Sequence, residues 1–207
     1  DFSFYGYTVD PGLDYTLHSG QNLISFPSHG SIGIGDGIPD EVEDQFTGII
    51  SEGVAALNMG DTWVGSLTAF EGTKGYWVQV QSALTFSYEL TNLSEDAATR
   101  LSPDRAPVGY EYKQSSQQAF YFIEGIVLDG ESIQDGDWVL DYNDNVLVGA
   151  REWNGAYTDI PVMGYDSHVE TAGYLENGET PTFKVIREKT SEEFILSGNL
   201  PVWANNE

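Results

Sequence analysis

Short apolar runs separated by turn residues are the feature of this sequence that most constrains its fold. The runs are rich in Val, Ile, Thr, Phe, Tyr and Trp, as in GYWVQV and LTFSYEL, and Gly, Asn and Asp recur between them. β-branched and aromatic side chains favour strands, and turn residues at such intervals are typical of β-sandwiches and barrels. No apolar run approaches the roughly 20 residues that a membrane-spanning helix needs. We therefore predict an all-β fold of two β-sandwich-like domains.

A single segment departs from the strand pattern and predicts one short helix near residues 39–48. Pro39 suits the first turn of a helix, and the acidic residues that follow it lie where the helix dipole favours negative charge. The apolar side chains around it recur at helical spacing. They are Ile38, Val42, Phe46, Ile49 and Ile50.

A polar stretch divides the sequence into two β-rich halves. Residues 92–116 are mostly polar and contain both Pro103 and Pro107, a composition that is typical of a linker. We therefore predict an N-terminal β-rich domain with the one helix at residues 1–91 and a C-terminal sandwich-like domain at residues 117–207.

The chain is strongly acidic, with 33 Asp and Glu against 8 Lys and Arg and a formal net charge of −25. Residues 1–73 contain no Lys or Arg at all. Such a surface repels phosphate backbones and anionic lipid, so we expect neither a nucleic-acid partner nor membrane insertion. Three causes fit the charge: solubility, bound Ca²⁺, or life in salty water, where ions screen the repulsion.

The sequence contains no cysteine, which excludes a disulfide framework, thiolate zinc sites and cysteine nucleophiles. It starts at Asp1 without a methionine or a signal peptide. We expect a processed mature protein or an excised module that is exported and lies outside the cell or on its surface.

Calcium is the metal that the composition favours. The stretch DGESIQDGDWVLDYNDN offers many carboxylate and amide oxygens within a short length, and these are the ligands that Ca²⁺ prefers. The spacing does not match an EF-hand loop, and acidic turns would give the same pattern. The candidate ligands are Asp129, Asp135, Asp137, Asp141, Asn143 and Asp144.

Aromatic residues near hairpin tips raise the possibility of a glycan-binding face. Trp153 and Tyr157 flank the turn NGA, and Trp203 follows near the C-terminus. Exposed aromatic rings stack on the C–H groups of sugars, which gives this alternative a mechanism. Alternation along a strand would instead direct the same rings into the core.

The sequence carries weak signals for catalysis. His18, His29 and His168 are far apart and do not have the spacing of metal ligands, and no nucleophile-elbow or phosphate-loop motif is present. A glycoside hydrolase remains an alternative because it needs only a pair of carboxylates, but a chain this acidic supplies pairs by chance. We expect a protein that is not an enzyme.

The first residues, DFSFYGYTV, are aromatic and strand-forming. Phe2, Phe4, Tyr5 and Tyr7 are therefore candidate self-assembly residues, because a strand of this kind can be donated to a neighbouring subunit. The alternative is that the strand docks in the core of its own domain.

The phrases HSGQNLISFP, IISEGVAALN, DTWVGSL and GTKGYWVQV resemble a β-rich module that recurs in large secreted proteins of marine and other environmental bacteria. The second half of the sequence looks like a companion module of the same proteins. The resemblance implies an extracellular, surface-associated β protein and transfers no functional residues. We expect a non-enzymatic structural or adhesive protein, with other protein chains or glycans as its partners.

Overall fold

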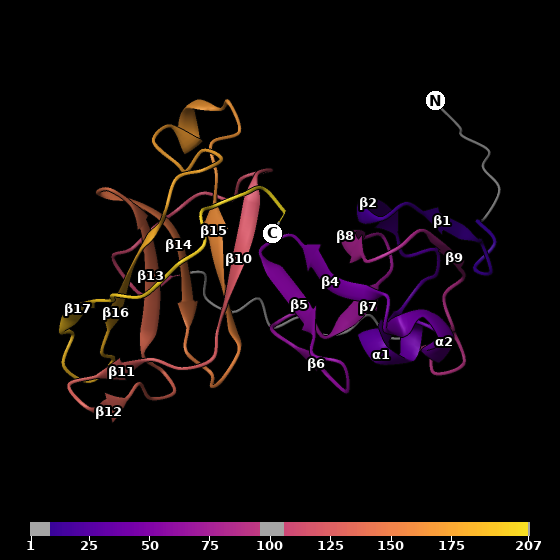
Figure 1. Cartoon of the computed structure of the whole chain (residues 1–207), viewed down its shortest axis with the longest axis horizontal. Coiled ribbons are helices and arrows are strands. Elements are labelled where there is room, and N and C mark those ends of the chain that lie inside the picture. Colours follow the sequence, from indigo (N-terminus) through magenta and orange to yellow (C-terminus); the bar gives the residue numbers. More distant parts are fainter. Residues whose placement is uncertain (1–8, 96–105, 207) are drawn as a thin grey trace, which may run out of the picture. The chain divides into compact units, whose positions relative to one another are not determined.

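The computed structural model describes residues 9–95 and 106–206 (Figure 1). The chain divides into two compact units, as follows. Unit 1 is formed by Asp1–Ser51, Ala56–Trp63 and Leu67–Arg100, and unit 2 by Glu52–Ala55, Val64–Ser66 and Leu101–Glu207. Short antiparallel strands are the main regular structure of both units and the helices are few and short, so the all-β prediction is confirmed.

The boundaries of the units differ from the predicted ones. Glu52–Ala55 and Val64–Ser66 belong to unit 2, although the sequence places them in the first half of the chain. The described part of the predicted linker also packs within unit 2, where Ser115 donates a 2.6 Å hydrogen bond to the carbonyl of Gly164. Residues 106–116 therefore belong to unit 2 in the structure.

Unit 1 is built around a five-stranded antiparallel sheet in the order β2-β8-β4-β5-β6, with two further strand pairs, β1-β9 and β3-β7. The strands are β1 (Tyr15–Leu17), β2 (Gly20–Ser25), β3 (Ser31–Gly33), β4 (Phe46–Ser51), β5 (Val54–Asn58), β6 (Trp63–Val64), β7 (Ala69–Glu71), β8 (Gly75–Val80) and β9 (Leu84–Phe86).

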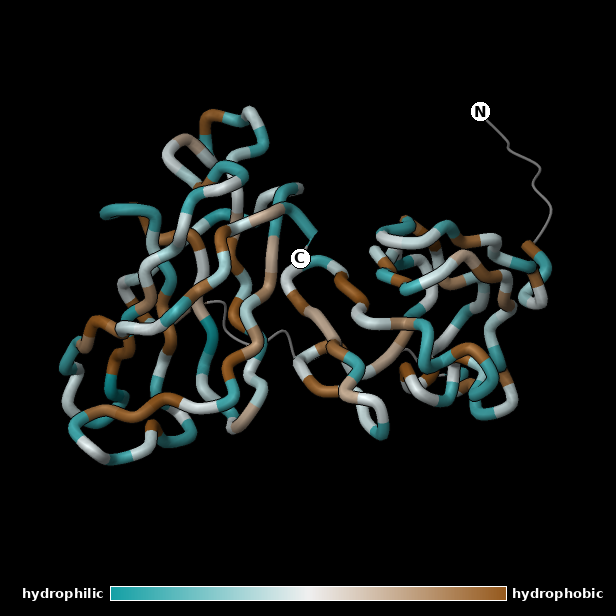
Figure 2. Tube along the Cα trace, viewed as in Figure 1, coloured by the Kyte–Doolittle hydropathy of each residue, from teal (hydrophilic) through white to brown (hydrophobic). Residues whose placement is uncertain are grey.

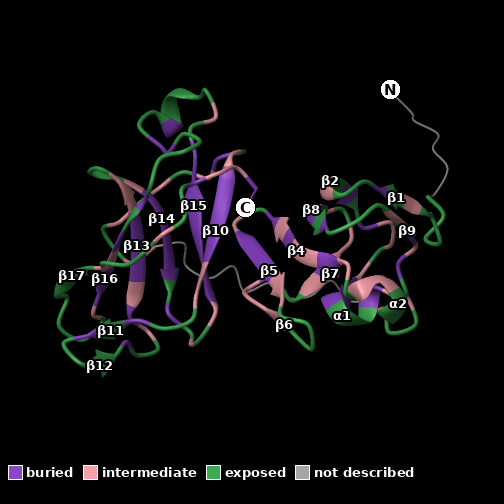
Figure 3. Cartoon of the chain, in the orientation of Figure 1, coloured by how far each residue is buried: buried purple, intermediate pink, exposed green. Residues whose placement is uncertain are grey.

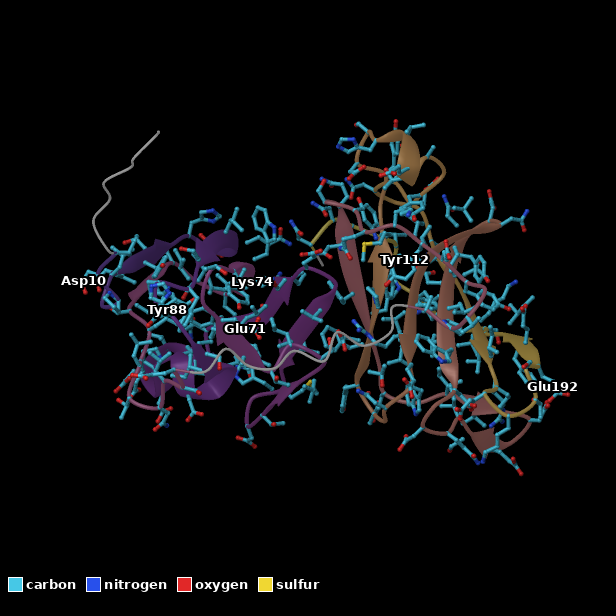
Figure 4. The ribbon with its side chains drawn as sticks, turned by 180° about the vertical axis from the view of Figure 1, so that it is seen from behind. Asp10, Glu71, Lys74, Tyr88, Tyr112 and Glu192 are labelled. Atoms are coloured by element: carbon cyan, nitrogen blue, oxygen red, sulfur yellow. The ribbon has the colours of Figure 1, made fainter. Side chains whose placement is uncertain are left out.

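Aromatic rings fill the core of unit 1. Tyr88 makes edge-to-face contacts with Phe26 and Phe70 at centroid distances of 5.0 and 4.9 Å, and further contacts with Tyr15 and Phe86. Figure 4 shows Tyr88 among the strands of this unit. Burial raises the pKa of the Tyr88 hydroxyl well above its usual value. Phe26, which directly follows β2, is therefore part of an aromatic core.

The helical region is shorter than predicted. It consists of two single turns, α1 (Ile34–Gly37) and α2 (Asp40–Glu43), and β4 begins at Phe46. The pairing of β4 with β8 contains an irregularity between Phe46 and Gly48. A bulge adds one residue to the alternation of a strand, so buried Phe46 and Ile49 are three positions apart. This spacing imitates the period of a helix.

Unit 2 contains a four-stranded antiparallel sheet in the order β14-β13-β16-β17, and two strand pairs, β10-β15 and β11-β12. The strands are β10 (Gln118–Ile123), β11 (Val127–Leu128), β12 (Glu131–Ser132), β13 (Trp138–Asn143), β14 (Val146–Glu152), β15 (Thr158–Met163), β16 (Thr182–Ile186) and β17 (Glu193–Ile195). A single 3₁₀ turn, η1 (Val169–Thr171), lies between β15 and β16.

The main core of unit 2 lies between the β10-β15 pair and one face of the four-stranded sheet. Ala119 and Ile160 from the pair meet Val139 and Val185 from the sheet in one buried cluster. The other face of the sheet carries Leu140, which packs with residues of the segment that precedes β10. Apolar residues therefore concentrate on the central strands, and β10, β13, β14 and β15 are largely buried (Figures 2 and 3). None of the helices in the described ranges is long and apolar enough to cross a membrane.

Candidate functional site

A nearly uncharged groove in unit 2 is the strongest candidate for a binding site. It has a volume of about 580 Å³, and two chain segments form its walls. One wall runs from β10 through β11, residues 119–128, and the other is the C-terminal segment, residues 195–202 together with Ala204. This volume is within the range of roughly 300–1,000 Å³ that ligand sites span.

The edge of β10 that faces away from β15 is open along part of its length. Gly164 N–H donates to the Gln117 carbonyl at 2.8 Å, which marks a hydrogen-bonded pair. Because such pairs alternate along an antiparallel ladder, Phe120 and Phe122 direct their N–H and C=O groups away from β15. Among the described residues, β15 is the one strand that pairs with β10. Phe120 and Phe122 therefore present main-chain donors and acceptors at an unpaired edge.

The position of Pro161 supports this register. Pro161 lies opposite Phe120 in the β10-β15 pair, at a position where β15 needs no N–H. A proline inside a strand is tolerated only at such a non-donating position.

The two walls of the groove are joined at one end and diverge toward the other. Asn206 N–H donates to the Gln118 carbonyl at 2.7 Å, and Gln118 N–H donates to Asn205 Oδ1 at 2.9 Å. Tyr121 also donates through its hydroxyl to the Pro201 carbonyl at 3.1 Å. The two bonds of Gln118 occupy the edge of β10 at that residue. The main-chain groups of Phe120 and Phe122, at the next two outward-facing positions, remain available to a partner strand.

Phe183 of β16 lines the groove between the two walls. Its ring contacts Tyr121 edge-to-face at a centroid distance of 5.3 Å, and both residues belong to the main core of unit 2. Ile195 of β17 lines the groove as well. Since β10 and β17 each pair with only one of the described strands, the groove lies where the strands of unit 2 leave two edges unjoined.

The lining of the groove is nearly uncharged. Glu124 is its one ionisable residue apart from Tyr121, in a chain of net charge −25. Three large apolar side chains of the lining are exposed: Val127 at 67%, Ile195 at 74% and Val202 at 56%. The groove holds the equivalent of roughly 20 water molecules. Water against such a surface is displaced favourably by an apolar occupant.

A buried ion pair supports the β10-β15 pair from outside the core. Arg151 Nη2 lies 3.2 Å from Asp159 Oδ2, and both side chains are less than one-tenth exposed. Asp159 also accepts from Ala55 N–H, Ser66 N–H and the Ser66 hydroxyl, and Arg151 donates to the Gly53 carbonyl. Burial raises the pKa of Asp159, and the Arg151 guanidinium opposes part of this rise. The network fastens Glu52–Ala55 and Val64–Ser66 to the strands of unit 2.

Asp141 of β13 is a second unusual carboxyl. It is completely buried, and within the described residues neither carboxyl oxygen makes a hydrogen bond of good geometry. Burial raises its pKa well above the usual value, an effect that the Tyr142 N–H partly opposes. A buried carboxyl without a cationic partner takes up a proton more readily than it ionises.

The residues predicted to bind calcium are not brought together. Asp137 instead accepts from Glu188 N–H at 3.0 Å and pairs with Arg187 at 3.4 Å, and Asp141 points into the interior. Asn143 uses its amide to donate to the Gly173 carbonyl. Asp129, Asp135 and Asp144 are exposed. Over residues 9–95 and 106–206, no group of three or more acidic or histidine side chains is placed to hold a metal.

Two of the three aromatic residues predicted to bind sugars belong to the core. Trp153 is 5% exposed and Trp203 is 2% exposed, and Trp203 donates through its indole nitrogen to the Val162 carbonyl at 3.0 Å. Their faces are therefore not available for stacking. Tyr157 is half-buried in the loop after β14, with a backbone φ of 63°.

The candidate self-assembly residues Phe2, Phe4, Tyr5 and Tyr7 lie outside the described residues.

The groove was not predicted from the sequence, although two short apolar runs lie in its lining. Val127 lies in the run GIVL and Ile195 in the run FILSG. Both side chains are exposed in the structure although both runs are apolar.

No protein-family model, no curated protein and no solved structure matches this chain. The proposed function therefore depends on the groove and its chemistry.

Proposed function

We propose that this protein is a non-enzymatic structural or adhesive protein that acts outside the cell and associates with other protein chains through the groove of unit 2. One observation carries this proposal: the edge of β10 that faces away from β15 borders a groove whose lining is nearly uncharged and combines apolar side chains with main-chain polar groups. Extended segments bind such sites by adding a strand to the edge, with main-chain hydrogen bonds for affinity and side-chain pockets for specificity. The exported character inferred from the sequence fits this role.

The chemistry of the lining supports binding more than catalysis. Glycoside hydrolysis uses two carboxyl groups on opposite sides of the bond that is cleaved, whereas the groove lining contains Glu124 as its one carboxylate and no histidine. Its polar groups are otherwise main-chain groups and the side chains of Ser197 and Asn199. An apolar, strand-like occupant satisfies this lining better than a sugar does.

The proposal is tested by measuring the mass of the protein in solution over a range of concentrations. We expect light scattering to report species heavier than the 22.8 kDa chain, and a Val127→Lys/Ile195→Lys variant to return to the mass of one chain. Val169→Lys is the matched control, because Val169 is 89% exposed in the same unit but does not line the groove. A wild-type protein that remains one chain at every concentration and binds no extended apolar peptide would contradict the proposal. Release of reducing sugar from a polysaccharide would contradict its non-enzymatic part.

A further inference from the structure

We propose that the occupant of the groove is the segment Phe2–Val9 of a second copy of this chain, added as a strand along the open edge of β10. This inference rests on the proposed function and names the partner of the same site. It combines the sequence of the segment with the geometry of the groove.

The charge of the segment matches the lining of the groove. Phe2–Val9 reads FSFYGYTV and contains no ionisable group except the two tyrosines. A charged segment would lose its hydration in the groove without gaining a partner, because Glu124 is the one charged side chain there. In a chain of net charge −25, an uncharged and aromatic run of this length is the kind of segment that the groove can accept without repulsion.

Alternation along an extended strand predicts which side chains enter the groove. Phe2 and Phe4 share one face of the segment, and Tyr5 and Tyr7 share the other. A strand beside β10 has one face toward the core and one toward solvent. We infer that the phenylalanines pack over Phe183, because tyrosine hydroxyls can remain in water when their rings cover the outer face.

The described residues that follow the segment are exposed. Every residue from Val9 to Asp14 is exposed, including the apolar Val9 at 59% and Leu13 at 44%. Asp10 accepts from Gly12 N–H and Leu13 N–H and so forms a turn just before β1. Figure 4 shows Asp10 at the margin of its unit. The chain thus leaves the core of unit 1 before the segment begins.

The donor and the acceptor lie in different units of the chain. The segment is attached to unit 1, whereas the groove is part of unit 2. A contact between two different surfaces of the same chain is heterologous, so it generates open chains of subunits or closed rings, of which the smallest is a pair that exchanges its segments reciprocally. The proposal therefore predicts linear or ring assemblies.

Two full-length variants separate the donor from the acceptor. Phe2→Ser/Phe4→Ser impairs the segment and leaves the groove intact, while Val127→Lys/Ile195→Lys does the reverse. We expect self-association of each to be at least about 30-fold weaker than that of the wild type, the effect of losing a buried aromatic or apolar contact at the centre of an interface. Tyr5→Ser/Tyr7→Ser is the matched control for the segment and is expected to weaken association much less.

Mixing the two impaired variants provides the decisive measurement. Phe2→Ser/Phe4→Ser can still accept a segment, and Val127→Lys/Ile195→Lys can still donate one. We expect the mixture to form a one-to-one complex with twice the 22.8 kDa mass of the chain, although each variant alone has the mass of one chain. A synthetic peptide of residues 1–10 should bind Phe2→Ser/Phe4→Ser and should not bind Val127→Lys/Ile195→Lys.

Other outcomes would overturn the inference in distinguishable ways. If the groove variant abolishes association but Phe2→Ser/Phe4→Ser does not, the groove is the contact and its occupant is a different segment or protein. If the wild type is a single chain and both variants lower its melting temperature, the segment occupies the groove of its own chain. If neither variant changes mass, peptide binding or stability, both this inference and the proposed function fail.

Discussion

Asp141 shows how one residue can set the response of the fold to pH. Its carboxyl is fully buried and makes no hydrogen bond of good geometry within the described residues, and burial raises its pKa above that of the unfolded chain. The folded protein therefore binds more protons than the unfolded protein as the pH rises above about 4. It follows that Asp141 lowers stability progressively from this pH upward until the raised pKa is passed.

We expect Asp141→Asn to be more stable than the wild type at pH 7 by at least about 1.4 kcal/mol, because each unit by which burial raises the pKa of Asp141 costs about this much once the unfolded carboxyl is ionised. The difference should shrink toward zero near pH 3, where the carboxyl is protonated in both states. Thermal melts from pH 3 to pH 8 measure it, with the exposed Asp144→Asn as control. A difference that is constant with pH would show that Asp141 is ionised in the fold.

The Arg151–Asp159 pair predicts the opposite effect of a substitution. Arg151→Met leaves a buried carboxylate without its cation, and loss of one partner of a buried pair costs about 3 to 5 kcal/mol. Lys184 and Glu193 form a more exposed pair with a separation of 3.7 Å, so Lys184→Met should cost less than about 1 kcal/mol. Urea denaturation of both variants makes the comparison. Equal losses would mean that the buried network does not support the fold.

Residue types alone indicated where acidic side chains gather but not what they contact. Asp137 directly precedes β13 and Asp141 lies within it, and composition alone predicts that both bind calcium. In the structure one pairs with Arg187 and the other enters the core. Long-range pairing decides between these environments, and a single sequence does not contain that information.

The residue type at a position in a strand is most restricted where the backbone of a second strand lies close to it. Gly149 of β14 lies against β15, and a Cβ at this position would overlap the carbonyl of Pro161. We expect Gly149→Ala to lose at least about 3 kcal/mol of stability, because backbone cannot move away as a flexible side chain can. Gly198→Ala is the control, since a Cβ there meets nothing within 4 Å. Circular dichroism melts of the two variants test this, and matching curves would disprove the close approach.

The strands could be predicted from the sequence because alternation and turn residues agree locally. β8 and β9, for example, lie in the runs GYWVQV and LTFSYEL, whose composition predicts strands. The helix near residues 39–48 was predicted too long, because the irregularity between Phe46 and Gly48 shifts the alternation. The open edge of β10 could not be predicted at all, since it depends on which strands become neighbours. Strand type is a local property, whereas strand order is a property of the whole unit.

For the whole molecule, net charge controls how readily copies approach each other. At −25, two chains repel over distances comparable to the Debye length, which falls from about 30 Å at 0.01 M salt to about 8 Å at 0.15 M. We therefore expect self-association through the groove to strengthen by at least about tenfold over this range. Light scattering in NaCl measures it, with Val127→Lys/Ile195→Lys as the non-associating control. Association that weakens with salt would indicate a contact dominated by ion pairs instead.

The membership of Glu52–Ala55 and Val64–Ser66 in unit 2 bears on how such a protein can evolve. A gene fragment that encodes only the second half of the sequence would lack both segments, and Asp159 would lose the donors that Ala55 and Ser66 supply. The second half is therefore poorly suited to duplication or transfer between genes on its own. We therefore expect recombination that preserves the fold to transfer both halves of the sequence together.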